Sequence, residues 1–513
     1  MTSPVNNGFV PQSRAARALR HYAALSLAAA LAGGCAVGPD FKRPQAPQTD
    51  SYTATPLPPK TAASAGPAGA AQTYVNGADI PAQWWTLFHS DKLNALVEQA
   101  LKSSPDVVAA QAALREAHEN VLAQEGSFFP SFDGNGSAAR QKINDASYGV
   151  PGGGSSIYNL YNATVNVSYT LDIWGGVRRG VEAQQAQAEY EKFQLEGTYL
   201  TLSSNVVTTA IQEASLRAQI EATGQIIAAD RKQLETVQRQ LGLGGASRLD
   251  VLTQQTQLAN ELATLPPLQK QLQQNRDLLA VLLGQLPSQQ PDVQFELADL
   301  QLPQDLPLSV PSQLVAQRPD VRAQESLLHQ ASAQVGVATA NMLPQVTISG
   351  QFGGTSTNFS DLLKSASNVW TLTGGVTQPI FHGGELIHKK RAAVAAYDQA
   401  AAQYRGTVLT AFRNVADALH ALNADAEALN QQNLATEAAA DTLKVSRSRY
   451  AAGSISPLDL LVVERTYQQA RIAQLQAQAA RYADTAALFQ ALGGGWWNRD
   501  AGGAAKQTTA ANP

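Results

Sequence analysis

An internal duplication is the feature that most constrains how this chain can fold. Five short motifs of the first half recur in the second half in the same order, about 210 residues later, and a fixed spacing of this kind marks a repeated structural unit. The recurring positions are Pro105 and Pro319, Pro130 and Pro344, Gly175 and Gly383, Gly244 and Gly453, and Leu283 and Leu492. We therefore expect two copies of one unit, residues 84–284 and 311–493, joined by a linker at 285–310.

Part of each unit has the sequence period of a β-strand. Apolar and polar residues alternate without exception over 163–173, and the alternation returns in the second unit. A period of two places successive side chains on opposite faces of a strand. The pattern predicts two strands in each unit, near 131–174 and near 344–381.

The following part of each unit has the period of a helix. No proline occurs over 152–265 or over 380–456, and proline is the residue that interrupts a helix most strongly. In the second unit the apolar stripe recurs about every 3.6 residues. We expect long helices at 177–240 and 385–449, each on the order of 95 Å in length.

Turns that contain glycine are expected to reverse the chain after each long helix. Return helices should follow at 247–283 and 456–492, because glycine commonly ends one helix before the next begins. The adjacent Pro266 and Pro267 predict a break in the first return helix. Residues 494–513 are rich in glycine, alanine and polar residues, and we expect a flexible C-terminal tail.

The N-terminus has the pattern of an export signal. Three arginines precede a short apolar stretch, which ends in small residues before Cys35, the only cysteine of the chain. We interpret 1–34 as a lipoprotein signal peptide and Cys35 as the site of a covalent diacylglycerol and N-acyl lipid (palmitate). An ordinary signal peptide is the alternative, since Leu31 lies four residues before the cysteine instead of three. Residues 35–83, rich in proline and alanine, are expected to form an extended tether.

Composition excludes several classes of protein. A net charge of −4 argues against nucleic-acid binding, and one cysteine rules out a disulfide framework within the chain. The seven histidines are scattered, and no phosphate-binding, zinc-protease or serine-hydrolase motif occurs. We therefore expect a protein that is not an enzyme and that has no metal and no cofactor other than the lipid.

Four strands of alternating polarity suit a membrane β-barrel, but four strands cannot close one. The smallest barrels have about eight strands, and open edges do not survive in lipid. Chains must therefore pool their strands, so that two chains supply eight and three supply twelve. A small soluble sheet in a structural periplasmic coiled-coil protein is the alternative interpretation.

The chain resembles a known family, the TolC-like outer-membrane efflux lipoproteins of Gram-negative bacteria, also described as NodT-type outer-membrane factors. The similar motifs are Gly34–Pro44, Trp84–Phe88, Pro105–Val107, Leu171–Gly176, Gln378–Phe381 and the positions Tyr450, Gly453, Ser456 and Asp459. The resemblance covers essentially residues 34–497. It implies an α+β membrane protein, a homotrimer whose 12-stranded transmembrane β-barrel, four strands per chain, continues into a long periplasmic α-helical coiled-coil barrel.

The same resemblance implies a function and partners. It indicates a passive exit duct in the outer membrane that exports small molecules such as drugs, driven by an inner-membrane pump of the resistance–nodulation–division (RND) class. A periplasmic adaptor, or membrane fusion protein, would connect the duct to the pump. A type I protein secretion duct is the alternative within this class. Ala36, rather than aspartate, follows the cysteine and also favours the outer membrane.

The resemblance further assigns roles to residues of the two turns. It implies a periplasmic gate at Tyr450, Leu458 and Asp459. The adaptor would contact the helix tips at Gly244, Ser247, Asp250, Gly453 and Ser456. The alternative for the two aspartates is that they cap the return helices near the positive helix N-termini, and both roles are compatible.

Overall fold

The computed structural model describes residues 36–144 and 154–499, which form two units. The first unit contains residues 36–42, Glu116–Ala188 and Ser326–Ala401, and the second contains the remainder. The predicted signal peptide, Cys35 and residues 500–513 of the predicted tail lie outside the described residues. Among the described helices, none combines the length and the apolar character needed to cross a membrane.

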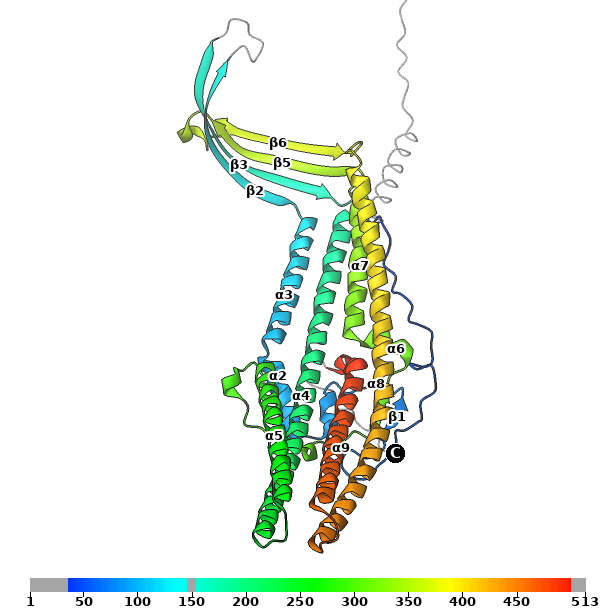
Figure 1. Ribbon diagram of the computed structural model, residues 1–513. Coiled ribbons are helices and arrows are strands. Elements are labelled where there is room, and N and C mark those ends of the chain that lie inside the picture. The colour runs from blue at the N-terminus through cyan, green and yellow to red at the C-terminus, as the bar shows by residue number, and fades with distance from the viewer. Residues whose placement is uncertain (1–35, 145–153, 500–513) are drawn as a thin grey trace, which may run out of the picture. The chain divides into compact units, whose positions relative to one another are not determined.

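The first unit is built on a four-stranded antiparallel sheet (Figure 1). Its strands are β2 (Ser131–Asn144), β3 (Ser155–Leu171), β5 (Gln345–Ser356) and β6 (Asn368–Thr377), in the order β2-β3-β5-β6. Each repeat supplies one pair of neighbouring strands, and β3 pairs with β5 to join the two repeats in one sheet. The sequence expectation of two strands per repeat agrees with this arrangement.

Helices follow the same order in both repeats. The first repeat has α2 (Asp91–Ser103), α3 (Pro105–Glu125), α4 (Gly176–Gly242) and α5 (Arg248–Leu282), and the second has α6 (Pro311–Gln317), α7 (Pro319–Ala340), α8 (Glu385–Ala451) and α9 (Pro457–Ala491). The helices α4 and α8 each have 67 residues, and α5 and α9 each have 35. These equal lengths are the structural counterpart of the duplicated sequence.

Helix α5 corrects the expected break at its two prolines. Pro266 and Pro267 lie inside a helix that continues from Arg248 to Leu282. Proline removes a hydrogen bond to the carbonyl four residues earlier, here those of Leu262 and Ala263. Both of these residues are exposed, so water can satisfy the two carbonyls without interrupting the helix.

The second unit has its aromatic core where α9 meets the segment before α2. The rings of Trp84 and Phe88, both fully buried, pack against Phe489 at centroid distances of 5.7 and 6.5 Å. Tyr482 adds a further ring beside Phe88, and its hydroxyl donates to the carbonyl of Leu300 at 2.9 Å. The tryptophan motif singled out in the sequence therefore forms packed core.

Part of the segment 35–83, expected to be an extended tether, is packed against the second unit. Residues 60–76, which we term the N-terminal strap, include strand β1 (Thr73–Asn76), which pairs in parallel with β4 (Asp305–Leu308) in the linker. Arg481 of α9 is fully buried beneath the strap and donates to Ala68 O at 2.6 Å and to Gln72 Oε1 at 3.1 Å. A buried guanidinium with five donors can order a segment that has few apolar side chains.

The start of the predicted C-terminal tail also differs from the expectation of a flexible segment. Residues Trp496–Asn498 form a short 3-10 helix, and the ring of Trp496 packs edge-on against Phe193 at 5.6 Å. Asn498 Nδ2 donates to Asp79 Oδ2 at 2.8 Å. The described part of the tail is therefore held to the second unit by ring packing and hydrogen bonds.

Candidate functional site: a two-faced sheet and two capped turns

One face of the four-stranded sheet is apolar. Directly paired residues of adjacent strands project to the same face, so the register identifies the members of each face. One row across the sheet contains Gly134, Val165, Phe352 and Trp370, and the next contains Phe132, Val167, Gly350 and Leu372. Phe352 and Trp370 are 62% and 74% exposed in the single chain. An exposed apolar surface of this kind marks a face that contacts lipid or another protein.

The opposite face of the sheet is polar. One row contains Asp133, Asn166, Gln351 and Thr371, and the next contains Ser131, Ser168, Ser349 and Thr373. The strict alternation of the sequence is therefore converted by the register into one lipid-compatible face and one water-compatible face.

The sheet also has two open edges. Within residues 36–144 and 154–499, β2 and β6 each pair with a neighbour on one side only. An unpaired edge exposes a row of backbone N–H and C=O groups, which cannot be left unsatisfied in lipid. A sheet with an apolar face and two open edges is therefore incomplete as a single chain in a membrane.

The segment that follows the predicted lipidation site docks at the end of β3. The amide of Val37 donates to Trp174 O at 2.9 Å, and Arg179 Nη2 pairs with Asp40 Oδ1 at 2.5 Å. Phe41 stacks on His329 at a centroid distance of 4.4 Å. Cys35 itself lies outside the described residues, but the residue after it is held beside Gly175, at the sheet end of α4.

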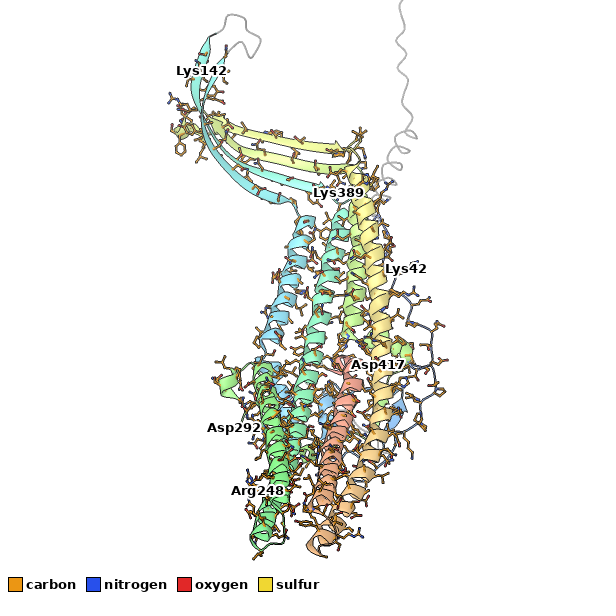
Figure 2. The ribbon with its side chains drawn as sticks, in the orientation of Figure 1. Lys42, Lys142, Arg248, Asp292, Lys389 and Asp417 are labelled. Atoms are coloured by element: carbon orange, nitrogen blue, oxygen red, sulfur yellow. The ribbon has the colours of Figure 1, made fainter. Side chains whose placement is uncertain are left out.

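The turn between α4 and α5 is closed by a capping box. The side chain of Ser247 accepts from the amide of Asp250 at 3.2 Å, and Asp250 Oδ2 accepts from the amide of Ser247 at 2.7 Å. Gly244 precedes this box with φ of 77°, a conformation that glycine adopts without steric cost. Figure 2 shows Arg248, the first residue of α5, beside this turn.

The turn between α8 and α9 repeats this arrangement. Ser456 and Asp459 form the second capping box, and Gly453 has φ of 71°. Hydrogen bonds from the Ser456 side chain and amide hold the pKa of the Asp459 carboxyl below 3.8. The amide of Ser247 contributes most to the corresponding lowering at Asp250. The capping role weighed for both aspartates is therefore present in the structure, and both stay ionised at neutral pH.

Tyr450 connects the two long helices next to the turns. Its hydroxyl donates to Gln240 Oε1 of α4 at 3.3 Å, and burial is the main reason that the pKa of Tyr450 is raised. Leu458, by contrast, is 59% exposed at the start of α9. The structure thus brings Tyr450 into contact with the first repeat, while Leu458 and Asp459 remain on the surface of the single chain.

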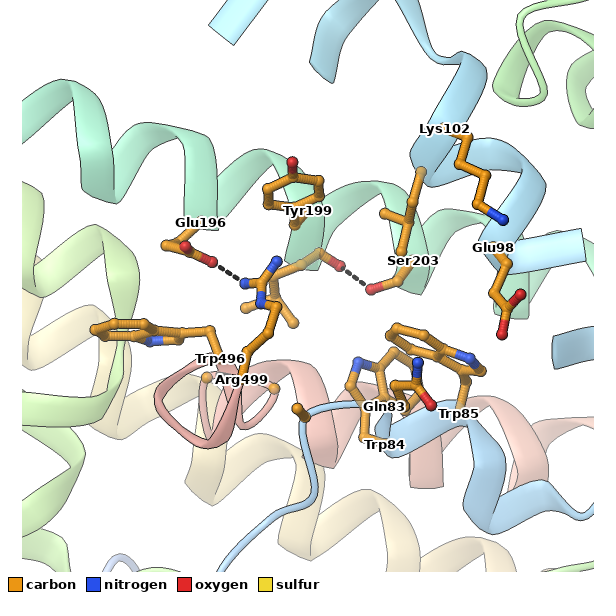
Figure 3. Close-up of a pocket in the computed structure, with 15 residues that line it drawn as sticks. Gln83, Trp84, Trp85, Glu98, Lys102, Glu196, Tyr199, Ser203, Trp496 and Arg499 are labelled. Carbon is orange, nitrogen blue, oxygen red and sulfur yellow. Dashed lines mark hydrogen bonds and ion pairs between the residues drawn. The ribbon is translucent and has the colours of Figure 1, made fainter. Parts of the chain in front are cut away.

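A cavity of about 450 Å³ in the second unit is lined by residues of α2, α4 and the segment after α9 (Figure 3). Its wall includes Trp84, Trp85 and Tyr199, and the guanidinium of Arg499 lies over the Tyr199 ring at 4.7 Å. Arg499 also forms an ion pair with Glu196. The cavity joins the tryptophan motif to the first residues of the predicted tail.

No group of three or more histidine, cysteine, aspartate or glutamate side chains in the described ranges could hold a metal ion. Sequence reasoning did miss one polar group in the helical part, Asp230 together with Glu261 and Glu464, all of which are buried. The signal was available, because acids at apolar stripe positions of a long helix are unusual.

Comparison with known proteins identifies the fold. The family described as outer membrane efflux protein matches residues 96–285 and 310–494, one segment in each repeat. The pyoverdine export outer membrane protein OpmQ of Pseudomonas putida is 31% identical over 450 residues, which are 86% of this chain and 94% of the relative. The cation efflux system protein CusC of Escherichia coli K12 is 25% identical, over 90% of this chain and 96% of the relative.

Solved structures give the same result. The outer-membrane channel OprN superposes with a TM-score of 0.79 at 29% identity, over 90% of this chain and all of that chain. The outer membrane protein VceC of Vibrio cholerae superposes with a TM-score of 0.75 at 26% identity, over 81% of this chain. The resemblance inferred from the motifs, the duplicated fold of strands and long helices, and the outer-membrane location are confirmed. This chain belongs to the outer membrane efflux protein family.

Proposed function

We propose that three copies of this chain form the outer-membrane exit duct of an efflux system. The observation that carries the proposal is the two-faced sheet with two open edges. Three chains would pool twelve strands, which closes every edge and places the apolar rows toward lipid and the polar rows toward a water-filled lumen. The long helices of the two repeats would continue the duct into the periplasm.

The test is the assembly state and the conductance of the protein from outer membranes. A trimer that is stable in detergent and forms ion-conducting channels in planar lipid bilayers is the expected result. A matched pair of variants locates the lipid face, because Phe352→Asp should lower the yield of inserted trimer while Gln351→Asp on the polar face should not. A soluble monomer that conducts no ions would overturn the proposal.

The transported compounds and the partners are a further part of this proposal. Relatives are named for export of pyoverdine, efflux of toluene and efflux of cations. A passive duct would take small molecules from an RND-type inner-membrane pump through a periplasmic adaptor, with no catalytic site and no cofactor of its own. Drug sensitivity of a deletion strain, restored by the plasmid-borne gene, tests this role. A deletion strain that stays as drug-sensitive with the plasmid-borne gene as without it would contradict it.

Lipidation at Cys35 is proposed from the sequence pattern and supported by the docked segment that follows it. Holding Ala36 beside Gly175 would place an acylated residue 35 at the end of the sheet, where the apolar face begins. Radiolabelled palmitate should enter the wild type and be absent from Cys35→Ser. Labelling of equal intensity in both proteins would refute lipidation at this residue.

The gate is proposed at the turn between α8 and α9, where Asp459 and Leu458 of three chains would surround the axis. The pKa below 3.8 supports a permanently ionised ring of carboxylates at this position. Tyr450 would hold α8 against α4. The tips around Gly244, Ser247, Asp250, Gly453 and Ser456 would contact the adaptor.

Single-channel recordings test the ring. Asp459→Asn should reduce the preference of the channel for cations, and Ser456→Ala serves as the control because it weakens the cap but keeps the charge. Identical selectivity in Asp459→Asn and the wild type would remove Asp459 from the gate.

A further inference from the structure

Three acidic side chains are buried together between the helices of the second unit. Asp230 of α4, Glu261 of α5 and Glu464 of α9 are 1%, 5% and 8% exposed. The first two belong to the first repeat and the third to the second repeat. They therefore meet where the α4–α5 pair contacts the α8–α9 pair, an interface that we term the seam.

Hydrogen bonds satisfy two of the three acids. Glu261 accepts from Gln257 Nε2 at 2.8 Å and, across the seam, from Gln468 Nε2. Glu464 pairs with Arg447 of α8, with Arg447 Nη2 at 3.2 Å from Glu464 Oε1. Each of these two carboxylates therefore accepts a hydrogen bond from a side chain on another helix.

Asp230 differs from the other two acids because one of its carboxylate oxygens has no hydrogen-bond donor. Its Oδ2 atom is buried and accepts no hydrogen bond, and the Nε2 atom of Gln254 on α5 is likewise buried without an acceptor. A cavity of about 210 Å³ lies beside Asp230. The polar side chains that line it with Asp230 are Gln225, Arg447, Glu464, Tyr467 and Arg471. A buried carboxylate oxygen without a donor is costly when ionised and inexpensive when protonated.

The charges around Asp230 act in the same direction as its burial. Burial, followed by Glu464 and then by Glu261, raises the pKa of Asp230 to about 7, and Arg447 opposes the shift. Arg471, the other cation at the cavity, donates to Gln474 Oε1 at 2.6 Å. The group therefore changes its charge in the physiological range, at a contact between the two repeats.

We propose that Asp230 is a proton-operated lock of the seam. Its neutral carboxyl allows α4 to pack against the acids of α5 and α9. Its ionisation adds a negative charge beside Glu261 and Glu464 that the single cation Arg447 does not neutralise, and so separates the α4–α5 pair from the α8–α9 pair. The Tyr450–Gln240 hydrogen bond crosses the same seam next to the turns, so separation would weaken it. Acid would thus close the helix ends and alkali would loosen them.

The experiment measures the separation of the two turns directly, independently of transport. Nitroxide labels are attached through Leu243→Cys and Ala452→Cys, which are exposed residues of the two turns, in full-length protein. Protomers that carry the two cysteines are co-expressed with an excess of protomers that lack them, and the purified protein is then labelled. Most trimers then contain at most one labelled protomer, so that distances within one protomer dominate. Pulsed electron paramagnetic resonance then gives the distance distribution between about pH 5.5 and about pH 8.5.

The wild type should shift to longer distances with a midpoint near pH 7. Asp230→Asn, a neutral side chain of the same shape, should keep the short distance throughout, while Glu235→Gln, an exposed acid on the same helix, should titrate like the wild type. Wild-type distances that do not change with pH, or an Asp230→Asn variant that titrates like the wild type, would overturn the lock.

A second variant keeps the proposal testable if Asp230→Asn fails to fold. Glu464→Gln removes a negative charge that raises the pKa of Asp230 and leaves Arg447 without its carboxylate partner. The midpoint of the distance change should therefore move to lower pH. The infrared carbonyl band of a protonated carboxylic acid should be lost as the pH rises, with the same midpoint as the distance change. An unshifted midpoint in Glu464→Gln, or a band that does not follow the distance, would refute the assignment.

Discussion

Replacing Arg481 tests whether the N-terminal strap is held by one buried cation. The guanidinium makes three hydrogen bonds to the strap, to Ala68 O at 2.6 Å, to Gln72 Oε1 at 3.1 Å and to Thr61 Oγ1 at 3.2 Å. A hydrogen bond from a charged donor contributes about 1.5–3 kcal/mol, and losing one partner leaves the others buried and unsatisfied.

The variant Arg481→Met keeps the length and the apolar stem of the side chain while removing the donors. Part of the loss is offset because a buried guanidinium also has a desolvation cost, and burial lowers the pKa of Arg481. We therefore expect strap docking to weaken by about 2–4 kcal/mol, which raises the population of the undocked strap by about 30-fold to about 1,000-fold.

Amide hydrogen exchange is the assay. The amides of Thr61 and Gln72, bonded to Gln72 O and Thr61 Oγ1 at 2.9 Å each, should lose protection in Arg481→Met. Arg465→Met, an exposed arginine on the same helix, is the matched control and should leave the exchange unchanged. Equal protection in Arg481→Met and in the wild type would refute the argument that this cation orders the strap.

Three further predictions concern the sheet, the caps and the acids. Phe352→Asp on the apolar face should destabilise the membrane-inserted state by up to about 2 kcal/mol per chain, while Gln351→Asp should cost little, as measured by urea titration of protein in vesicles. Ser456→Ala should lower stability by about 1 kcal/mol in the same titration, because the return helix loses its cap. An unchanged free energy of unfolding in Ser456→Ala would show that water replaces the capping hydrogen bond. For Asp230 the folded pKa is raised from 3.8 to about 7, so the folded protein binds the proton more tightly and its stability falls as the pH rises through this range. The unfolding temperature of the wild type should therefore fall relative to that of Asp230→Asn between about pH 5 and about pH 8, and parallel curves would contradict the sign.

The regular elements could be predicted from the sequence because their signals are local. Strand β3 follows from alternation at positions i and i+2, and α8 follows from a stripe near 3.6 residues with no proline. The capping boxes at Ser247 and Ser456 are likewise short-range patterns, since the serine and the aspartate are three residues apart. The duplication then extended each prediction to the other repeat.

Other features depend on which surfaces meet. Proline pairs usually interrupt helices, but Pro266 and Pro267 remain within α5 because their freed carbonyls are exposed to water. The composition of the strap predicts an extended tether because it cannot form a core, and its partners, the distant Arg481 and strand β4, are visible only in the tertiary structure.

The sequence by itself determined the repeat, the alternation of strands and helices, the family and the two turns. Only the tertiary structure decided that β3 pairs with β5 in a register that separates an apolar face from a polar one. It also decided that Asp230 lies near Glu261 of its own repeat and near Glu464 of the other repeat, across the seam. The physical reason is range, since periodicity and capping act within a few residues, whereas register and charge burial depend on side chains that are hundreds of residues apart in the chain.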